Sequence, residues 1–144
     1  MLSKTLKLVL ACSLVGLASS SIAQAKICSQ QDAIQAETEA STLPDWDSVY
    51  KSFQRFGHCD DGAIAEGYSD TIGRLLAKEW KHFERLPELT RNDKEFRRFV
   101  IRHIDETLPS DYLNQIIENA NLRCPSNAKP LCGAIVKAAK QGDD

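Results

Sequence analysis

Apolar residues recur along most of the chain at intervals of three and four, which is the spacing of one face of an α-helix. The clearest case runs from Trp46 through Val49 and Phe53 to Phe56. Glycine is sparse, and no run of β-branched residues with strict alternation appears, so the sequence offers no clear strand. The pattern predicts an all-α protein.

Start and stop signals divide this pattern into five to six helices. Asp60 and Asp61 are expected to begin the longest helix, because carboxylates favour the positive helix end, and Pro87 is expected to stop it. Asn92 is expected to cap the next helix, with Glu95 three residues later as its capping-box partner. Short connections make neighbouring helices antiparallel, which predicts a small up-down bundle. The expected helices cover about 30–40, 44–56, 60–86, 92–104, 109–120 and 129–141.

The first 25 residues have the layout of a secretory signal peptide. Lys4 and Lys7 give a positive start, Leu8–Ala18 is an apolar stretch, and Ala23-Gln24-Ala25 supplies an A-x-A cleavage site. The apolar stretch is too short to span a bilayer, which takes about 20 residues. We therefore expect cleavage after Ala25, with no stable membrane insertion of the mature chain.

The mature chain is expected to be one exported, periplasmic domain over residues 26–144. The alternative is a lipoprotein that carries lipid on Cys12, although the apolar stretch continues well past that residue. Because residues 1–25 contain two lysines and no acid, cleavage changes the formal net charge from −2 to −4. An acidic chain is a poor match for nucleic acid or an anionic membrane, since both require a basic surface. It is compatible with a basic protein partner.

Four of the five cysteines remain after cleavage: Cys28, Cys59, Cys124 and Cys132. An even number in a small exported domain indicates disulfides. Without a C-x₂-C pair or clustered histidines, we expect no metal site, and nothing in the sequence indicates a cofactor. The up-down order brings Cys28 and Cys59 to one end of the bundle, while Cys124 and Cys132 flank a turn at the other end. Of three possible connectivities, this favours the pairs 28–59 and 124–132.

No segment has the pattern of a known active site, such as a serine elbow, a phosphate-binding glycine loop or a paired-histidine helix. His58 beside Cys59 could form a thiol nucleophile and its base, but adjacent residues rarely face each other well enough. A disulfide cysteine between a helix stop and a helix cap explains this segment better. We therefore predict a binding protein rather than an enzyme.

Four acids lie close together at the start of the longest helix: Asp60, Asp61, Glu66 and Asp70. Glu66 and Asp70 are four residues apart and therefore share a helix face. With few basic residues nearby in the sequence, these acids are our candidate partner-binding surface. The alternative is a solvated acidic face on which Asp60 and Asp61 only cap the helix.

The helix expected at 92–104 carries two further polar features. His103 falls on its apolar stripe and is expected to be a core histidine bonded to a backbone carbonyl. A basic ridge runs along the same helix, and salt bridges to neighbouring acids are expected to account for most of it. The ridge comprises Lys94, Arg97, Arg98 and Arg102, and the acids are Glu95, Asp105 and Glu106.

A longer pattern begins at Cys59, continues with Gly67-Tyr68-Ser69-Asp70 and ends with Cys124-Pro125. It resembles the Rap/Tai group of periplasmic immunity proteins, which protect bacteria from cell-wall amidases delivered by type VI secretion. The chain departs from that group at Leu86-Pro87, where many members have Cys-Pro, and in its additional Cys132. The resemblance implies an all-helical inhibitor that blocks a toxin's active cleft, in some members as a homodimer.

Two hypotheses follow. The first is a periplasmic inhibitor that binds a cognate secreted toxin. The second is a helical module that binds a small ligand or a component of the envelope, since apolar pockets between helices suit such ligands. The aromatic residues that could line such a pocket are Trp46, Tyr50, Phe53, Trp80 and Phe83.

Overall fold

The computed structural model describes residues 26–142, and every regular element in that range is helical. The all-α prediction is confirmed, with seven α-helices in these residues where five to six were expected. The proposed signal peptide, its cleavage site and Cys12 lie outside the described residues. The α-helices are α1 (Gln30–Ala40), α2 (Trp46–Phe56), α3 (Gly62–Ala77), α4 (Arg85–Asn92), α5 (Lys94–Arg102), α6 (Ser110–Leu122) and α7 (Lys129–Gly142). The 3₁₀ turns are η1 (Gly57–Cys59), η2 (Trp80–His82) and η3 (Ser126–Ala128).

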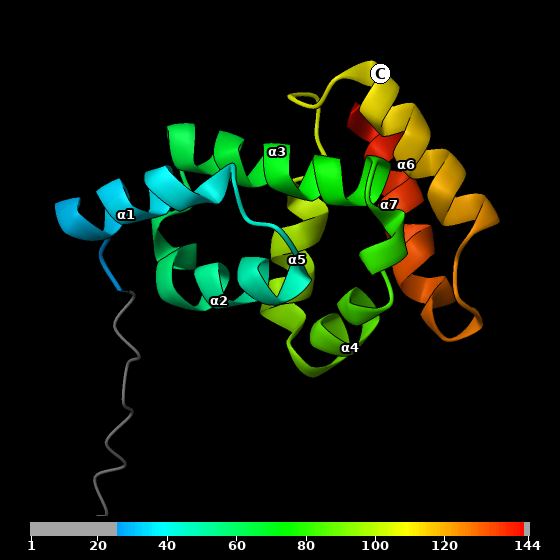
Figure 1. Cartoon of the computed structure of the whole chain (residues 1–144), viewed down its shortest axis with the longest axis horizontal. Coiled ribbons are helices and arrows are strands. Elements are labelled where there is room, and N and C mark those ends of the chain that lie inside the picture. The colour runs from blue at the N-terminus through cyan, green and yellow to red at the C-terminus, as the bar shows by residue number, and fades with distance from the viewer. Residues whose placement is uncertain (1–25, 143–144) are drawn as a thin grey trace, which may run out of the picture.

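The helices are arranged around α3, which runs along the length of the molecule (Figure 1). At one end α1 packs against α2 and α3, and at the other end α6 and α7 form an antiparallel pair that contacts α3 through α6. α4 and α5 lie between these ends. The C-terminal end of α5 contacts the segment before α3 through Asp60 and the middle of α3 through Ser69, and these contacts position the candidate site.

The core is built from the apolar stripes that the sequence pattern indicated. Aromatic rings of α2, α3 and α5 contact one another, with ring centroids 4.9 Å apart for both Tyr68–Phe99 and Phe53–Phe99. Gly67 lets α1 approach α3 closely, because a Cβ atom at that position would lie 2.9 Å from the Cβ of Ala40. The largest fully buried side chains include Trp46, Tyr68, Phe83, Phe96 and Phe99.

The prediction of one long helix from Asp60 to Leu86 is wrong, because α3 ends at Ala77. Asn119 of α6 donates hydrogen bonds from Nδ2 to the carbonyl oxygens of Leu76 and Ala77, at 2.9 and 3.0 Å. These bonds satisfy carbonyls that a helix end leaves without an intrahelical partner. None of the described helices combines the length and apolar character needed to cross a membrane.

Two predicted helix boundaries also differ from the structure. Pro87 lies in the first turn of α4, where a missing backbone N–H costs no helical hydrogen bond, so it does not end a helix. Asp93 caps α5 in place of Asn92, accepting a hydrogen bond from the N–H of Phe96 at 2.9 Å. The Tyr50 hydroxyl donates to the same aspartate at 3.3 Å, so a contact from α2 accompanies this cap.

Both predicted disulfides are present. Cys28–Cys59 ties the chain before α1 to η1, and Cys124–Cys132 ties the end of α6 to α7. The two bonds lie at opposite ends of the molecule, as the order of the helices predicted. The first disulfide closes a separation of 31 residues and the second a separation of 8.

Candidate functional site

The turn into α3 sends two neighbouring aspartates in different directions. Asp61 is exposed and caps the helix, accepting a hydrogen bond from the N–H of Gly62 at 2.8 Å. Gly62 has a φ of 52°, in the left-handed region that favours glycine. Asp60 precedes this turn, and its side chain is only 5% exposed. The expectation that both aspartates present free charge is therefore wrong for Asp60.

Asp60 is held by two basic side chains at the end of α5. Its Oδ2 accepts a hydrogen bond from Arg102 Nε at 2.9 Å and lies 3.2 Å from His103 Nε2. Burial raises the pKa of Asp60, but the hydrogen bonds and charges of His103 and Arg102 together lower it below the ordinary value. The negative charge of Asp60 is thus compensated within the protein, and its contacts join the start of α3 to the end of α5.

A chain of polar contacts continues from His103 back to α3. His103 Nδ1 lies 3.0 Å from Ser69 Oγ, and that hydroxyl is also within donating distance of Asp105 Oδ2, at 3.3 Å. His103 is buried, as the sequence pattern indicated. The prediction that His103 bonds to a backbone carbonyl is wrong, because its two ring nitrogens contact the side chains of Asp60 and Ser69.

These residues form a connected serine, histidine and aspartate group, yet the geometry differs from that of serine hydrolases. In those enzymes the serine contacts Nε2 of the histidine and the aspartate contacts Nδ1. Here the two contacts are exchanged, because Ser69 contacts Nδ1 of His103 and Asp60 contacts Nε2. Ser69 is also 3% exposed and lies inside α3, where backbone N–H groups are used in helical hydrogen bonds. The group therefore joins α3 to α5 and does not present a nucleophile.

An open pocket of about 250 Å³ lies beside this polar group. Asp61 and Glu66 lie on its rim, while Asp70 is exposed on α3 outside it. The structure thus brings three of the four predicted acids to one pocket. Its lining comprises Asp60, Asp61, Ala65, Glu66, Ser69, Arg102, His103, Asp105 and Thr107.

The basic side of this site is not apparent from the sequence. Arg102 was expected to pair with a neighbouring acid, but it pairs with Asp60, which lies 42 residues away in sequence. The expectation that few basic residues lie near the acids is therefore wrong for Asp60, which contacts both Arg102 and His103. Ser69 carried a usable signal, because it is a polar residue next to Tyr68 and three positions before Ile72, both of which are fully buried.

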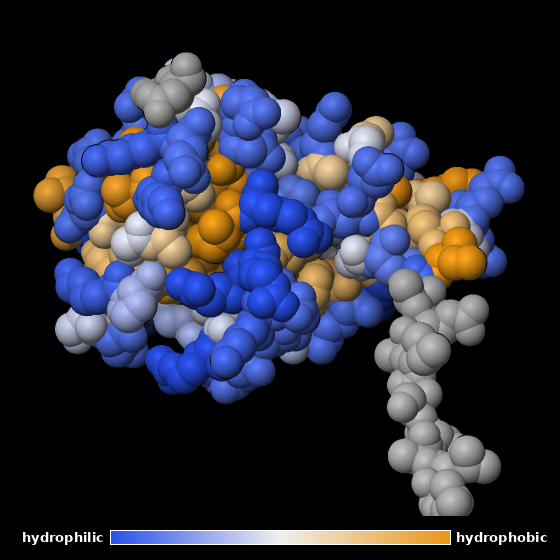
Figure 2. All heavy atoms as spheres, turned by 180° about the vertical axis from the view of Figure 1, so that it is seen from behind, coloured by the Kyte–Doolittle hydropathy of each residue, from blue (hydrophilic) through white to orange (hydrophobic). Residues whose placement is uncertain are grey.

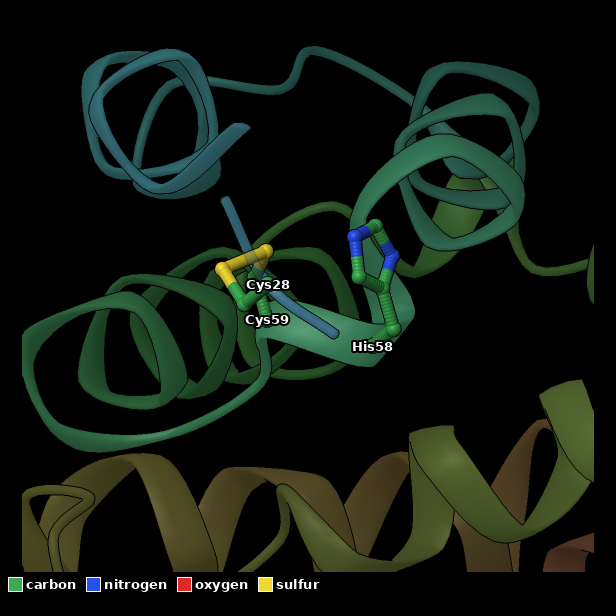
Figure 3. A group of neighbouring side chains, drawn as sticks. All are labelled: Cys28, His58 and Cys59. Atoms are coloured by element: carbon green, nitrogen blue, oxygen red, sulfur yellow. A yellow bond between two sulfur atoms is a disulfide. The ribbon is translucent and has the colours of Figure 1, made fainter. Parts of the chain in front are cut away.

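One group of side chains with metal-ligand chemistry occurs among residues 26–142: Cys28, His58 and Cys59 (Figure 3). Their candidate ligand atoms lie within 4.8 Å of one another. The two sulfur atoms are joined in the disulfide, so neither is a thiolate, the form that binds metals. His58 Nε2 lies 3.2 Å from Asp32 Oδ2, a contact that ties η1 to α1.

The aromatic residues of the ligand-module hypothesis mainly fill the core. Trp46 and Phe83 are fully buried, and the rings of Trp80 and Phe83 stack with centroids 4.1 Å apart. Tyr50 and Phe53 pack against the same core and against Phe96. The aromatic lining that this hypothesis required is therefore absent from the described pockets, apart from Trp80 in one of them.

The lowered pKa of Asp60 predicts acid sensitivity. A carboxyl group with a lower pKa in the folded state stabilises the fold above its unfolded pKa and loses that contribution as the pH falls. The free energy of unfolding should therefore decrease between about pH 5 and pH 3. Urea denaturation across this range should show a smaller decrease for Asp60→Asn than for the wild type.

Asp70→Asn is the control for this acid transition, because Asp70 is exposed and in no ion pair among the described residues. It should retain the wild-type pH dependence. An Asp60→Asn protein with an unchanged acid transition would show that Asp60 does not couple folding to pH.

Comparisons with protein-family models, with curated proteins and with solved structures found no match to this chain.

Proposed function

We propose that the mature chain is a periplasmic immunity protein that binds and neutralises a secreted toxin of the cell-wall amidase type. The predicted export signal and the resemblance from Cys59 to Pro125 support this assignment. The resemblance is to an inhibitor group, and the serine, histidine and aspartate group does not present a nucleophile. In this proposal the protein acts by binding and carries out no reaction.

The observation that carries the proposal is an exposed acidic face, formed by Glu66 and Asp70 on α3 and by Asp61, which caps that helix. No basic group among residues 26–142 forms an ion pair with any of the three. Their charges are therefore available to a partner, in contrast to that of Asp60.

The acidic face is held on a rigid support. The opposite side of α3 is buried in the core, and the segment before the helix is fixed by the Cys28–Cys59 disulfide and by the contacts of Asp60. Because the surface is already ordered, a partner that binds here causes little loss of conformational entropy in this protein. Complementary charge speeds association and selects the partner, so a basic toxin cleft is the matching surface.

Reversing two charges of this face tests the proposal without changing the Asp61 cap. Glu66→Lys combined with Asp70→Lys should weaken binding to the cognate amidase-type toxin by about tenfold or more, mainly by slowing association. Surface plasmon resonance at several salt concentrations would measure both the affinity and its dependence on salt.

The matched control reverses two exposed acids elsewhere, Glu37 on α1 and Glu118 on α6. Glu37→Lys with Glu118→Lys changes the net charge equally and should leave the affinity close to that of the wild type. Equal affinity and salt dependence in both double variants would place the interface outside α3. Failure of the wild-type protein to bind the toxin or to protect cells that produce it would overturn the immunity function itself.

A further inference from the structure

A second charged surface lies away from the acidic face, in a hollow of about 500 Å³ between α4, α5 and the segment from η3 to α7. We call it the basic hollow. Its lining carries four cationic side chains and no acidic one: Arg91, Lys94, Arg97 and Arg98. On a chain with an excess of acidic residues, this is a local reversal of charge.

Most of this positive charge is not neutralised within the protein. Arg98 pairs with Glu95, but Arg91, Lys94 and Arg97 take part in no ion pair among the described residues. The prediction that neighbouring acids account for most of the basic ridge is therefore wrong. Of the neighbouring acids, Glu95 pairs with Arg98 alone, and the oxygens of Asp105 contact Ser69 and Thr107.

The hollow has an apolar floor and fixed walls. Pro87, Ala128 and Leu131 are buried residues of its lining. Arg97 donates a hydrogen bond to the carbonyl oxygen of Pro130 at 3.4 Å, and the Cys124–Cys132 disulfide holds the same wall. Such a preformed hollow lowers the entropy cost of binding a ligand.

A neighbouring hollow of about 410 Å³ extends this surface along α5. It shares Arg97 and Arg98 with the basic hollow and adds Ile101 and Arg102 of α5 and Ala134 of α7. Figure 2, which views the molecule from behind, shows strongly hydrophilic side chains gathered in the middle of the face beside an apolar area. Cationic and apolar side chains thus line the two neighbouring hollows together.

We propose that the basic hollow binds a phosphate ester with an apolar body. Guanidinium groups match phosphate oxygens in a two-pronged geometry, and several uncompensated cations favour a group that can carry more than one negative charge. The phosphate lies against Arg91, Lys94 and Arg97, while the apolar body extends toward Ile101 and Ala134. The ligand comes either from free phosphate esters or from the headgroups of anionic phospholipids.

Binding of soluble dihexanoyl phosphatidic acid tests this site directly by isothermal titration calorimetry. The full mature protein should bind it saturably, and Arg91→Gln with Lys94→Gln should weaken binding by about tenfold or more. Neither side chain makes a hydrogen bond or ion pair among the described residues, so the variant should fold normally, with an unchanged melting temperature as the check. The charge-matched control is Lys51→Gln with Lys137→Gln, two exposed lysines outside the hollow, which should bind as the wild type does.

Sedimentation with vesicles separates the two sources of the phosphate. Capture by vesicles that contain phosphatidic acid but not by pure phosphatidylcholine vesicles, lost in the Arg91 and Lys94 variant, assigns the site to membrane headgroups. Binding of the soluble ligand alone assigns it to free phosphate esters. No saturable binding of the soluble ligand up to about 10 mM, or equal binding by both double variants, overturns the proposal.

Discussion

Trp80→Ala is expected to lower the free energy of unfolding by about 3–5 kcal/mol, as truncation of large aromatic residues in cores does. Trp80 is 8% exposed and stacks on Phe83 with an interplanar angle of 8°. Its Nε1 donates a hydrogen bond to the carbonyl oxygen of Arg123 at 3.2 Å, which ties η2 to the end of α6. Urea denaturation followed by far-ultraviolet circular dichroism would measure the change.

Trp80→Phe separates the two contributions of this side chain. It retains an aromatic ring beside Phe83 but removes the hydrogen bond to Arg123, so it should cost less than the alanine variant. A loss below about 1 kcal/mol for Trp80→Ala would be typical of an exposed residue and would contradict the buried position. Trp80 would then become a candidate contact for a protein partner, since exposed tryptophans are often interface anchors.

Removal of the Cys28–Cys59 disulfide by Cys28→Ser with Cys59→Ser is expected to cost about 3–4 kcal/mol. The bond restricts the unfolded chain over a separation of 31 residues, and loop entropy makes longer closures more stabilising. The variant also frees η1, which precedes the acidic face of α3. Denaturant unfolding of the purified variant would give the loss in stability.

Cys124→Ser with Cys132→Ser is the comparison, because its disulfide closes a separation of only 8 residues. The same entropy argument gives about 2.5 kcal/mol for it. This variant should also leave binding through the acidic face intact, because the bond lies at the other end of the molecule. A larger loss for the shorter closure would show that native contacts around α6 and α7 outweigh loop entropy.

The two proposed binding surfaces lie on different elements and have opposite charge. The acidic face belongs to α3, whereas the basic hollow is formed by α4, α5 and α7. Arg102 links the two regions, since it pairs with Asp60 and also lines the hollow next to the basic one. The acidic face and the lining of the basic hollow share no side chain, so substitutions in one surface can be tested without removing side chains of the other.

Periodicity was sufficient for the helical class and for most helices, because amphipathic stripes are a local property of the chain. α1 and α2 lie close to the predicted ranges, although α2 begins at Trp46 after Pro44 and the Asp45 cap. The disulfide pairing also followed from sequence, since the order of short antiparallel helices limits which cysteines can meet.

The position at which α3 ends, Ala77, could not be predicted from the sequence. The apolar spacing continues from Leu76 through Trp80 to Phe83, and a helix would use it equally well. The observed end of the helix is stabilised by a tertiary contact, the hydrogen bonds that Asn119 of α6 donates to the last carbonyls of α3. Such a contact joins residues more than 40 positions apart and leaves no local signal.

The candidate site likewise has one part that the sequence predicts and one part that only the folded structure shows. Sequence alone placed Glu66 and Asp70 on one face of a helix, because that follows from helical spacing. It could not show that Asp60 is buried against Arg102 and His103, since α5 reaches the start of α3 only after the chain has folded. Burial and pairing decide which charge is available, so tertiary structure reduced four candidate acids to three exposed ones.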